Sequence, residues 1–412
     1  MNLTKLINIL PKESYLWYWI KDQEYYETPR ICDFWSGLFT LSTLVAHNVK
    51  IRDIYEDIYP NFLMFLLHED NIIVTDNLLL RINDFISKYK HEDAIHINGR
   101  SDIMGIINEL HTLKQQKKHN ILLCTSTSIG AFYGTAKGFY YYQDLYNNLT
   151  ERKGYNGRSK YIFGPVFMHS ISCGSFAEYV ETIISNRESD WTAGSNILIP
   201  IGNVKKRCVD WENNGYNPCY KNLAKEKAEE IRKKEPYTVT FDYETSKFLN
   251  KTIRKQRCTD DTFRSFYANR RKLTVKLSGL LAINRQSTVV EKQDVKNAID
   301  LLQDLMKNIK VYVKNVTNNT YLDELDKLIL SIQKILLHQG DSGIKHSELW
   351  QRVRQKTDVN TYKSVMLIMH ELGIVDKYIM KRGKAVLYMR NVNTQTLDCN
   401  KIVKKYRELS NA

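Results

Sequence analysis

The spacing of apolar residues predicts alternating strands and helices in the first half of the chain. Short apolar runs at Phe62–Leu67, Asn120–Cys124 and Ile197–Ile201 are typical of buried strands. Apolar residues at helical spacing over Thr75–Lys88 and Asp102–Lys114 predict helices between them. Strands that alternate with helices in this way predict a three-layer α/β domain with a mainly parallel sheet.

The flanking regions are predicted to be mostly helical. The spacing of apolar residues predicts helices from residue 1 to about residue 50. Phe139–Leu149 predicts a helix, Tyr161–Ser172 a strand that is interrupted at Gly164-Pro165, and Phe176–Ile184 a further helix. Ser172 and Cys173 lie at the end of this predicted strand. Residues 240–313 predict helices only, which we interpret as a helical lid beside the α/β domain.

Residues 321–391 form the clearest unit in the sequence. The predicted elements are an amphipathic helix with Leu325, Leu328, Ile332, Ile335 and Leu336 on one face, helices at Ser347–Arg354 and Asp358–Leu372, and strands at Ile374–Met380 and Ala385–Met389. The turn Lys381-Arg382-Gly383-Lys384 joins the two strands. Three helices followed by a basic hairpin predict a winged helix-turn-helix.

Basic residues are concentrated in the second half of the chain. Residues 1–200 contain 19 Lys and Arg against 22 Asp and Glu, whereas residues 201–412 contain 41 against 24. This excess indicates that a polyanion such as nucleic acid binds to the second half. A lysine-rich surface that serves only solubility is the alternative.

The composition also limits the class of protein. Apolar and charged residues make up 43% and 26% of the chain, as in soluble globular proteins. No apolar run is long enough to span a membrane, and the N-terminal residues lack a signal-peptide pattern, so we expect a cytoplasmic protein without a membrane partner. Cys208 and Cys219 suggest half a zinc site, but no second pair completes it, so we expect no metal and no cofactor.

Residues 61–80 have the layout of a phosphate-binding loop without its chemistry. Such a loop needs glycines, whose backbone N–H groups surround phosphate, and a lysine that neutralises the outer charges. Residues 68–74 contain no glycine, and Val74 occupies the position of the lysine, followed by Thr75. Glu69 and Asp70 would repel a triphosphate. A hydrolase also needs an acidic pair after the next buried strand, where this chain has Thr125 and Ser126.

The predicted winged helix contains the residues expected to contact DNA. Cations in the wing can lie along a phosphate backbone, and polar residues near the start of the third helix can reach base edges in the major groove. The predicted DNA-binding residues are Lys381, Arg382, Lys384, Asn360, Thr361, Lys363, Ser364, Arg352, Arg354 and Lys356. A winged helix that contacts protein is the alternative. A second basic cluster, Arg264, Arg270, Arg271, Lys272 and Lys276, could contact nucleotide or nucleic acid, or form a solvated helix face.

Over residues 25–391 the chain resembles a family of phage, plasmid and mobile-element proteins. In this family an AAA+ helicase-like core, related to the minichromosome-maintenance ATPases, precedes a helical lid and a winged helix. The resembling segments are Glu27-Thr28-Pro29, Phe34-Trp35, Tyr59-Pro60-Asn61, Lys272–Ala282, and Asp294 with Ala298-Ile299. The resemblance implies a P-loop NTPase-like core and places Lys276 where a sensor arginine often stands beside the nucleotide.

The departures from this family all remove catalytic groups. Val74 replaces the P-loop lysine, Thr125 and Ser126 replace the acidic pair, and residues 194–198 contain no arginine finger. We therefore expect a degenerate nucleotide site, formed by Val74, Thr75, Thr125, Ser126 and Lys276, in a protein that is not an active ATPase.

The sequence as a whole predicts an inactive AAA+-like protein that binds duplex DNA in the replication or maintenance of a mobile element. Its expected partners are DNA and either a second copy of the chain or an active ATPase. One alternative is an ATPase that holds phosphate with Lys137 or Lys276, and another is an adaptor whose winged helix binds protein. The expected domains are a helical segment at 1–50, the core at 51–240, the lid at 241–318, the winged helix at 319–391 and a tail at 392–412.

Overall fold

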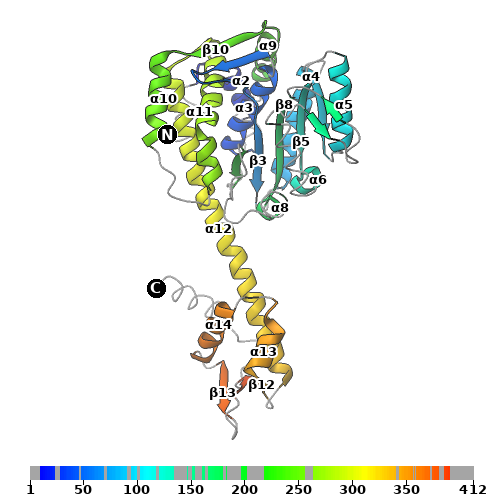
Figure 1. Cartoon of the computed structure of the whole chain (residues 1–412), viewed down its shortest axis with the longest axis vertical. Helices are drawn as coiled ribbons and strands as arrows, with labels where there is room; N and C mark the ends of the chain where they lie inside the picture. Colours follow the sequence, from blue (N-terminus) through cyan, green and yellow to red (C-terminus); the bar gives the residue numbers. More distant parts are fainter. Residues whose placement is uncertain are drawn as a thin grey trace. The chain divides into compact units, whose positions relative to one another are not determined.

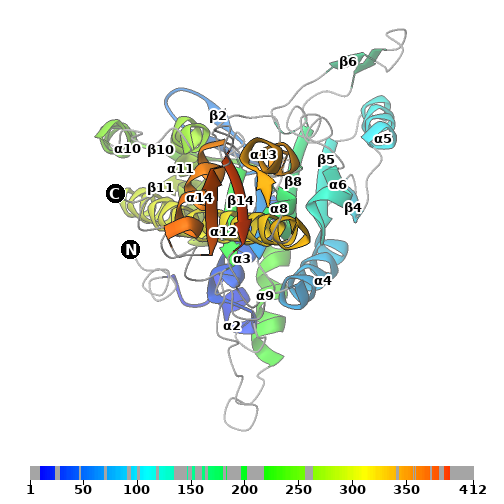
Figure 2. The same cartoon turned by 90° about the horizontal axis from the view of Figure 1, so that it is seen from below.

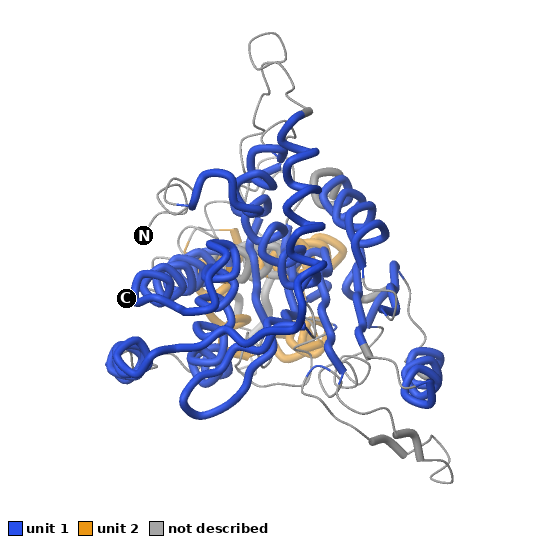
Figure 3. Tube along the Cα trace, turned by 90° about the horizontal axis from the view of Figure 1, so that it is seen from above, with its two compact units in different colours: residues 1–312 blue, residues 313–412 orange. Residues whose placement is uncertain are grey.

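In the computed structural model the chain divides into two units, residues 1–312 (unit 1) and residues 313–412 (unit 2) (Figures 1 and 3). Unit 1 includes the predicted helical segment, the core and most of the lid, and unit 2 begins close to the predicted boundary at residue 319. The structure describes residues 10–23, 28–45, 48–68, 72–90, 94–99, 103–116, 120–133, 146, 151–153, 160–162, 166–179, 182, 196–201, 218–255, 263–339, 343–355, 357, 359–371, 374–379 and 385–389.

A five-stranded sheet with the strand order β4-β5-β8-β3-β9 forms the centre of unit 1 (Figure 1). Its strands are β3 (Leu63–His68), β4 (Ala94–Asn98), β5 (Asn120–Ser126), β8 (Val166–Ser175) and β9 (Asn196–Ile201). All neighbouring strands are parallel, and β3, β8 and β9 are almost entirely buried. A sheet covered on both faces needs such continuous apolar strands. The predicted α/β domain with a mainly parallel sheet is confirmed.

Helices cover both faces of this sheet. The helices α3 (Arg30–Val45) and α6 (Ile129–Tyr133) contact adjacent residues of β8. Ser42 in α3 lies 3.0 Å from Nδ1 of His169, and the Tyr133 hydroxyl in α6 lies 2.9 Å from that of Ser170. Because consecutive strand residues point to opposite faces, α3 and α6 lie on opposite sides of the sheet. The sheet is therefore the middle of three layers.

The other helices of the core pack around these layers. They are α2 (Tyr15–Gln23), α4 (Ile72–Tyr89), α5 (Ile103–Gln115), α8 (Phe176–Tyr179) and α9 (Pro218–Arg232), and the strands β6 (Glu151–Lys153) and β7 (Lys160–Ile162) form a separate antiparallel pair. The helices α2, α4 and α9 lie side by side (Figure 2). Of the helix predicted at Phe139–Leu149, only Tyr146 is among the described residues.

A second sheet in unit 1 joins segments that are far apart in the sequence. Its order is β11-β10-β1-β2, from β1 (Val49–Arg52), β2 (Asp57–Ile58), β10 (Tyr237–Phe241) and β11 (Val289–Val290). The sequence predicted helices throughout residues 240–313, and α10 (Tyr243–Lys255), α11 (Arg264–Asn284) and the first part of α12 (Lys292–Gln339) are helical, but β11 is a strand. These strands are too short for apolar periodicity to reveal them.

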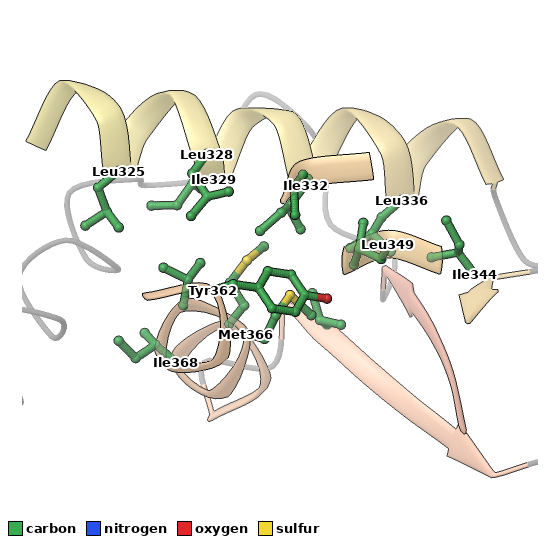
Figure 4. Packing of buried hydrophobic residues seen from close by; sticks show 14 residues of the cluster. Leu325, Leu328, Ile329, Ile332, Leu336, Ile344, Leu349, Tyr362, Met366 and Ile368 are labelled. Carbon is green, nitrogen blue, oxygen red and sulfur yellow. The ribbon is translucent and has the colours of Figure 1, made fainter. Parts of the chain in front are cut away.

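Unit 2 is built around a hydrophobic core of its own (Figure 4). Its elements are the part of α12 that follows Tyr312, then β12 (Ile344–Lys345), α13 (His346–Val353), α14 (Val359–Glu371), β13 (Val375–Ile379) and β14 (Ala385–Met389). The three strands form an antiparallel sheet in the order β12-β14-β13. Leu325, Leu328, Ile332 and Leu336 of α12 point into the core, as their spacing predicted.

Candidate nucleotide edge and candidate nucleic-acid interface

The carboxyl ends of the parallel strands meet at one edge of the central sheet, which is the place predicted for a nucleotide. The strand β3 ends at His68, opposite Ser175 of β8, and α4 begins at Ile72. Val74 and Thr75 therefore lie in the first turn of α4, whereas the sequence predicted that the loop runs to Val74 and that the helix begins at Thr75. Glu69 and Asp70 lie outside the described residues.

The hydroxyls at the end of β5 are bonded to other groups of the chain. Thr125 donates a hydrogen bond to Asn83 of α4, and its hydroxyl lies 3.3 Å from Nε2 of His96. Ser126 donates to the backbone oxygen of Ser128 at 2.7 Å and accepts from the backbone N–H of the same residue at 3.2 Å. Both side chains are buried. The pair predicted to replace the acidic residues thus stabilises the local backbone and the contact with α4.

A carboxylate that the sequence analysis missed lies beside this edge. Glu178 of α8 is half-buried and accepts a hydrogen bond from the Ser128 hydroxyl. A Cβ on Gly174 would meet the Glu178 carboxylate at 2.5 Å, so the glycine leaves room for it. The only signal in the sequence is an acidic residue just after a strand. Its proximity to Ser128 depends on the pairing of β5 with β8, which the sequence does not reveal.

Burial also determines the chemistry of Cys124 and His96 near the ends of the strands. Cys124 is fully buried, and burial raises the pKa of its thiol. Burial, together with the charge of Lys90, lowers the pKa of His96 and favours the neutral imidazole. Ser172 and Cys173 were predicted to end the strand, but β8 continues to Ser175 and buries both residues within it. Their side chains are therefore part of the packing of the sheet.

Lys276 does not lie with the other predicted nucleotide-site residues. Its ammonium group donates to the backbone and side-chain oxygens of Asn61, at 2.7 Å each, and to the Tyr146 hydroxyl at 2.6 Å. Asn61 precedes β3, so Lys276 is near the amino end of the sheet. The carboxyl end of β3 lies about 17 Å from the first residue of this strand. The resemblance implied that Lys276 lies beside the nucleotide, but its hydrogen bonds place it at the other end of the strands.

Burial determines the chemistry of Lys276. Only 1% of the residue is exposed, and no salt bridge of Lys276 occurs among the described residues. Desolvation lowers the pKa of its ammonium group well below the ordinary value. The three oxygens around it satisfy its hydrogen bonds, so the lysine supports the contact between α11 and the core.

Two arginines of the second basic cluster also bond within unit 1. Arg271 forms an ion pair with the buried Asp53 and lies 4.7 Å from the centre of the Tyr55 ring. Arg270 is buried and donates to the backbone oxygen of Ile253 at 2.8 Å. These two arginines attach α11 to its neighbours. Their guanidinium groups therefore neither contact phosphate, as one prediction held, nor form a solvated helix face, as the alternative held.

In unit 2, one face of α14 presents several of the predicted DNA-contacting residues. Asn360 and Lys363 are exposed, and Thr361 and Ser364 are half-buried, whereas Tyr362 on the opposite face is buried in the core. Because Val359 is the first residue of α14, these side chains lie in its first two turns. They have the position of residues that reach base edges.

The structure describes only two of the other predicted DNA-binding cations, Arg352 and Arg354. Arg354 is exposed directly after α13. Arg352 is exposed as well, but it donates to Glu348 at 2.7 Å, one helical turn earlier. Lys356 and the wing residues Lys381, Arg382 and Lys384 lie outside the described residues, although β13 and β14 on either side of the wing are paired as predicted.

No protein-family model matches the chain, and a search of curated proteins found no similar sequence. Within the described ranges, no group of three or more His, Cys, Asp or Glu side chains is arranged to hold a metal ion. Among the helices that the structure describes, none combines the length and the apolar character needed to cross a membrane.

Proposed function

We propose that this protein is a catalytically inactive AAA+-like protein that binds duplex DNA through a winged helix in unit 2, in the replication or maintenance of a mobile element. The observation that supports this best is the exposed polar and basic face of α14, held on a hydrophobic core beside a three-stranded antiparallel sheet.

The order of the strands in the central sheet supports an AAA+-like core. Numbered along the chain, they run 5-1-4-3-2 across the sheet, an open parallel arrangement that is compatible with a P-loop NTPase-like core. After β3 the chain crosses to β4 on one side of the sheet, and after β8 it crosses to β9 on the other side. The carboxyl ends of the neighbouring strands β3 and β8 therefore flank a topological switch point. Ligands of open α/β sheets bind at such points.

The groups at this edge support the loss of ATP hydrolysis. Phosphoryl transfer needs cations around the phosphates and a carboxylate that holds Mg²⁺. Val74 replaces the lysine, and Thr125 and Ser126 bond to their own neighbours. The carboxylate beside this edge, Glu178, is bonded to Ser128. Because Lys276 is buried near the opposite edge, the alternative ATPase with Lys276 on phosphate loses its support.

The order of elements in unit 2 supports a winged helix. A helix, a short strand, two helices and two paired strands follow one another, and the last two strands flank the basic turn. In this arrangement the third helix enters the major groove and the wing contacts the backbone. Residues 313–412 contain 17 Lys and Arg against 10 Asp and Glu, which favours an anionic partner.

The adaptor function remains a second candidate because of two apolar residues on α14. Val359 and Leu367 are 43% and 54% exposed and lie on the helix that would read DNA. Apolar side chains can contact thymine methyl groups, but they also suit a protein partner. Binding that survives nuclease treatment and involves Leu367 would favour the adaptor.

Fluorescence anisotropy with a labelled DNA duplex at low salt tests the DNA-binding proposal. The wild-type chain should bind, and the double variant Asn360→Ala, Lys363→Gln should bind about tenfold more weakly or worse because base-edge contacts are lost. Lys334→Gln on α12 is the matched control for an exposed lysine of unit 2. The proposal fails if the wild type does not bind, or if the double variant and the control bind equally.

A phosphate-release assay with ATP and Mg²⁺, with and without DNA, tests the inactive site. We expect no turnover above that of a heat-denatured sample. Turnover that is lost in the Lys137→Ala variant would instead establish the unconventional ATPase.

A further inference from the structure

A cavity of about 220 Å³ lies in unit 1 between α2, α4 and α9, away from the nucleotide edge. Its α4 residues lie between Leu80 and Tyr89, so they begin about 12 Å along the helix from its first residue, Ile72. Figure 2 shows the three helices side by side. The cavity is therefore separate from the carboxyl ends of the strands.

Aromatic rings form one wall of the cavity. The rings of Trp19 and Phe85 are 5.3 Å apart and nearly perpendicular, and those of Phe85 and Tyr89 are 4.7 Å apart. Trp19 and Phe85 are buried, while Leu80 at the rim is 63% exposed. Such walls favour a flat aromatic ligand over a branched aliphatic one.

Two buried acceptor oxygens line the same cavity without hydrogen-bond partners. Asp22 and Gln23, at the end of α2, are 8% and 2% exposed. Within the part of the chain that the structure describes, Oδ1 of Asp22 and Oε1 of Gln23 accept no hydrogen bond. The other oxygen of Asp22 accepts only a long hydrogen bond, of 3.4 Å, from the Gln23 amide. Buried acceptors cost free energy unless a donor satisfies them, so a ligand with donors would stabilise these two oxygens.

Cations outnumber carboxylates around the cavity. Its lining includes four basic residues, Arg81, Lys88, Lys221 and Lys225, and two acidic ones, Asp22 and Asp84. Asp84 already pairs with Lys88 at 2.8 Å. Lys221 and Lys225 lie one turn apart on α9 and are half-exposed, which suits an anion at the entrance. A fitting ligand is thus flat and combines hydrogen-bond donors with an anionic group.

We propose that this cavity binds a guanine mononucleotide, with the base against the aromatic wall and the phosphate on Lys221 and Lys225. The hydrogen-bonding edge of guanine carries two neighbouring donors, the ring N–H and the exocyclic amino group, which match the oxygens of Asp22 and Gln23. Adenine has a ring acceptor next to its amino group, so one of the two oxygens would face a lone pair. This binding does not depend on DNA recognition by unit 2.

Isothermal titration calorimetry of the full chain with GMP, AMP and guanosine tests the ligand class. GMP should bind saturably, AMP should bind at least about tenfold more weakly, and guanosine should be weakened by loss of the phosphate contact. The proposal is overturned if GMP gives no saturable binding at millimolar concentration, or if AMP and GMP bind equally well.

Two variants test the location. Asp22→Asn should weaken GMP binding by about tenfold or more, because a hydrogen bond to a charged acceptor is lost. Glu226→Gln, an exposed carboxylate of α9 outside the cavity, is the matched control and should leave the affinity within about twofold. Ala224→Leu, which places a larger side chain into the cavity, should abolish binding while circular dichroism shows a folded chain. Unchanged GMP affinity in a folded Ala224→Leu variant would refute the site, even if Asp22→Asn does not fold.

Discussion

At the scale of single residues, two arginine–aspartate pairs at or beside the second sheet of unit 1 differ mainly in burial. Asp53 is fully buried at its side chain and pairs with Arg271, which is 25% exposed, over a long sequence separation. Arg52 and Asp57 pair at 2.8 Å with side chains that are 58% and 36% exposed. Water screens the second pair but not the first, so their contributions to stability should differ.

We predict that Asp53→Asn lowers the free energy of unfolding by about 2 kcal/mol or more, because the variant leaves the Arg271 guanidinium without its counter-ion. Asp57→Asn should leave the free energy of unfolding almost unchanged. Urea denaturation of both variants measures the difference. Equal losses in the two variants would contradict the role assigned to Asp53.

Lys276 should make the stability of the protein depend on pH. Burial lowers the pKa of this lysine in the folded chain, whereas in the unfolded chain it returns to about 10.4. Between these two pKa values the unfolded chain binds more protons, so the free energy of unfolding rises with pH, by at most about 1.4 kcal/mol per unit. Below both pKa values the slope is zero.

The variant Lys276→Met should remove this rise, while Lys251→Met, an exposed lysine of α10, should keep it. Urea titrations from neutral pH to just below about 10.4 measure the slope for each variant. An identical slope in wild type and Lys276→Met would mean that the folded pKa is ordinary and that the three surrounding oxygens hold the ammonium charged.

At the scale of elements, Gly279 sets how closely α11 approaches β1. A Cβ at this position would collide with the side chain of Ile51. We predict that Gly279→Ala destabilises the chain by about 1 to 3 kcal/mol through overpacking. Gly105→Ala, in the exposed part of α5, should instead stabilise it by about 0.5 to 1 kcal/mol, as alanine does in helices. Thermal unfolding of both variants checks the opposite signs, and a gain for Gly279→Ala would disprove the close packing.

The elements that local pattern specifies were predicted well from the sequence. The apolar run before His68 became β3, and the spacing from Leu325 to Leu336 became the buried face of α12. The second sheet was missed because its paired strands β1 and β10 are far apart in the sequence. Strands this short also show no apolar periodicity from which they could be predicted. Lys276 was misplaced for a related reason: a lysine is normally exposed, and only the packing of α11 against Asn61 buries it.

At the scale of the whole molecule, the positive charge does not by itself indicate which unit binds the proposed DNA partner. Residues 201–312 contain 24 Lys and Arg against 14 Asp and Glu, so unit 1 shares the excess with unit 2. In unit 1, however, Arg271 and Lys276 are bonded within the fold. What distinguishes unit 2 is the combination of an exposed polar helix face with a basic turn between paired strands. The geometry, rather than the net charge, is therefore the reason why we propose that unit 2 binds DNA.

The salt dependence of binding should separate the contributions of the wing and of α14. Each phosphate neutralised by a cation adds about 0.9 to the slope of log affinity against log salt concentration. Replacing Lys381, Arg382 and Lys384 by alanine should therefore lower the slope by up to about 2.7 and weaken binding equally for different duplex sequences. Asn360→Ala should leave the slope unchanged and alter only the preference among sequences, because an uncharged side chain releases no counterion. Anisotropy titrations over a range of salt concentrations measure both effects. If the wing variant retains the wild-type slope, the wing does not lie on the phosphate backbone, and the exposed Leu367 on α14 then favours a protein partner.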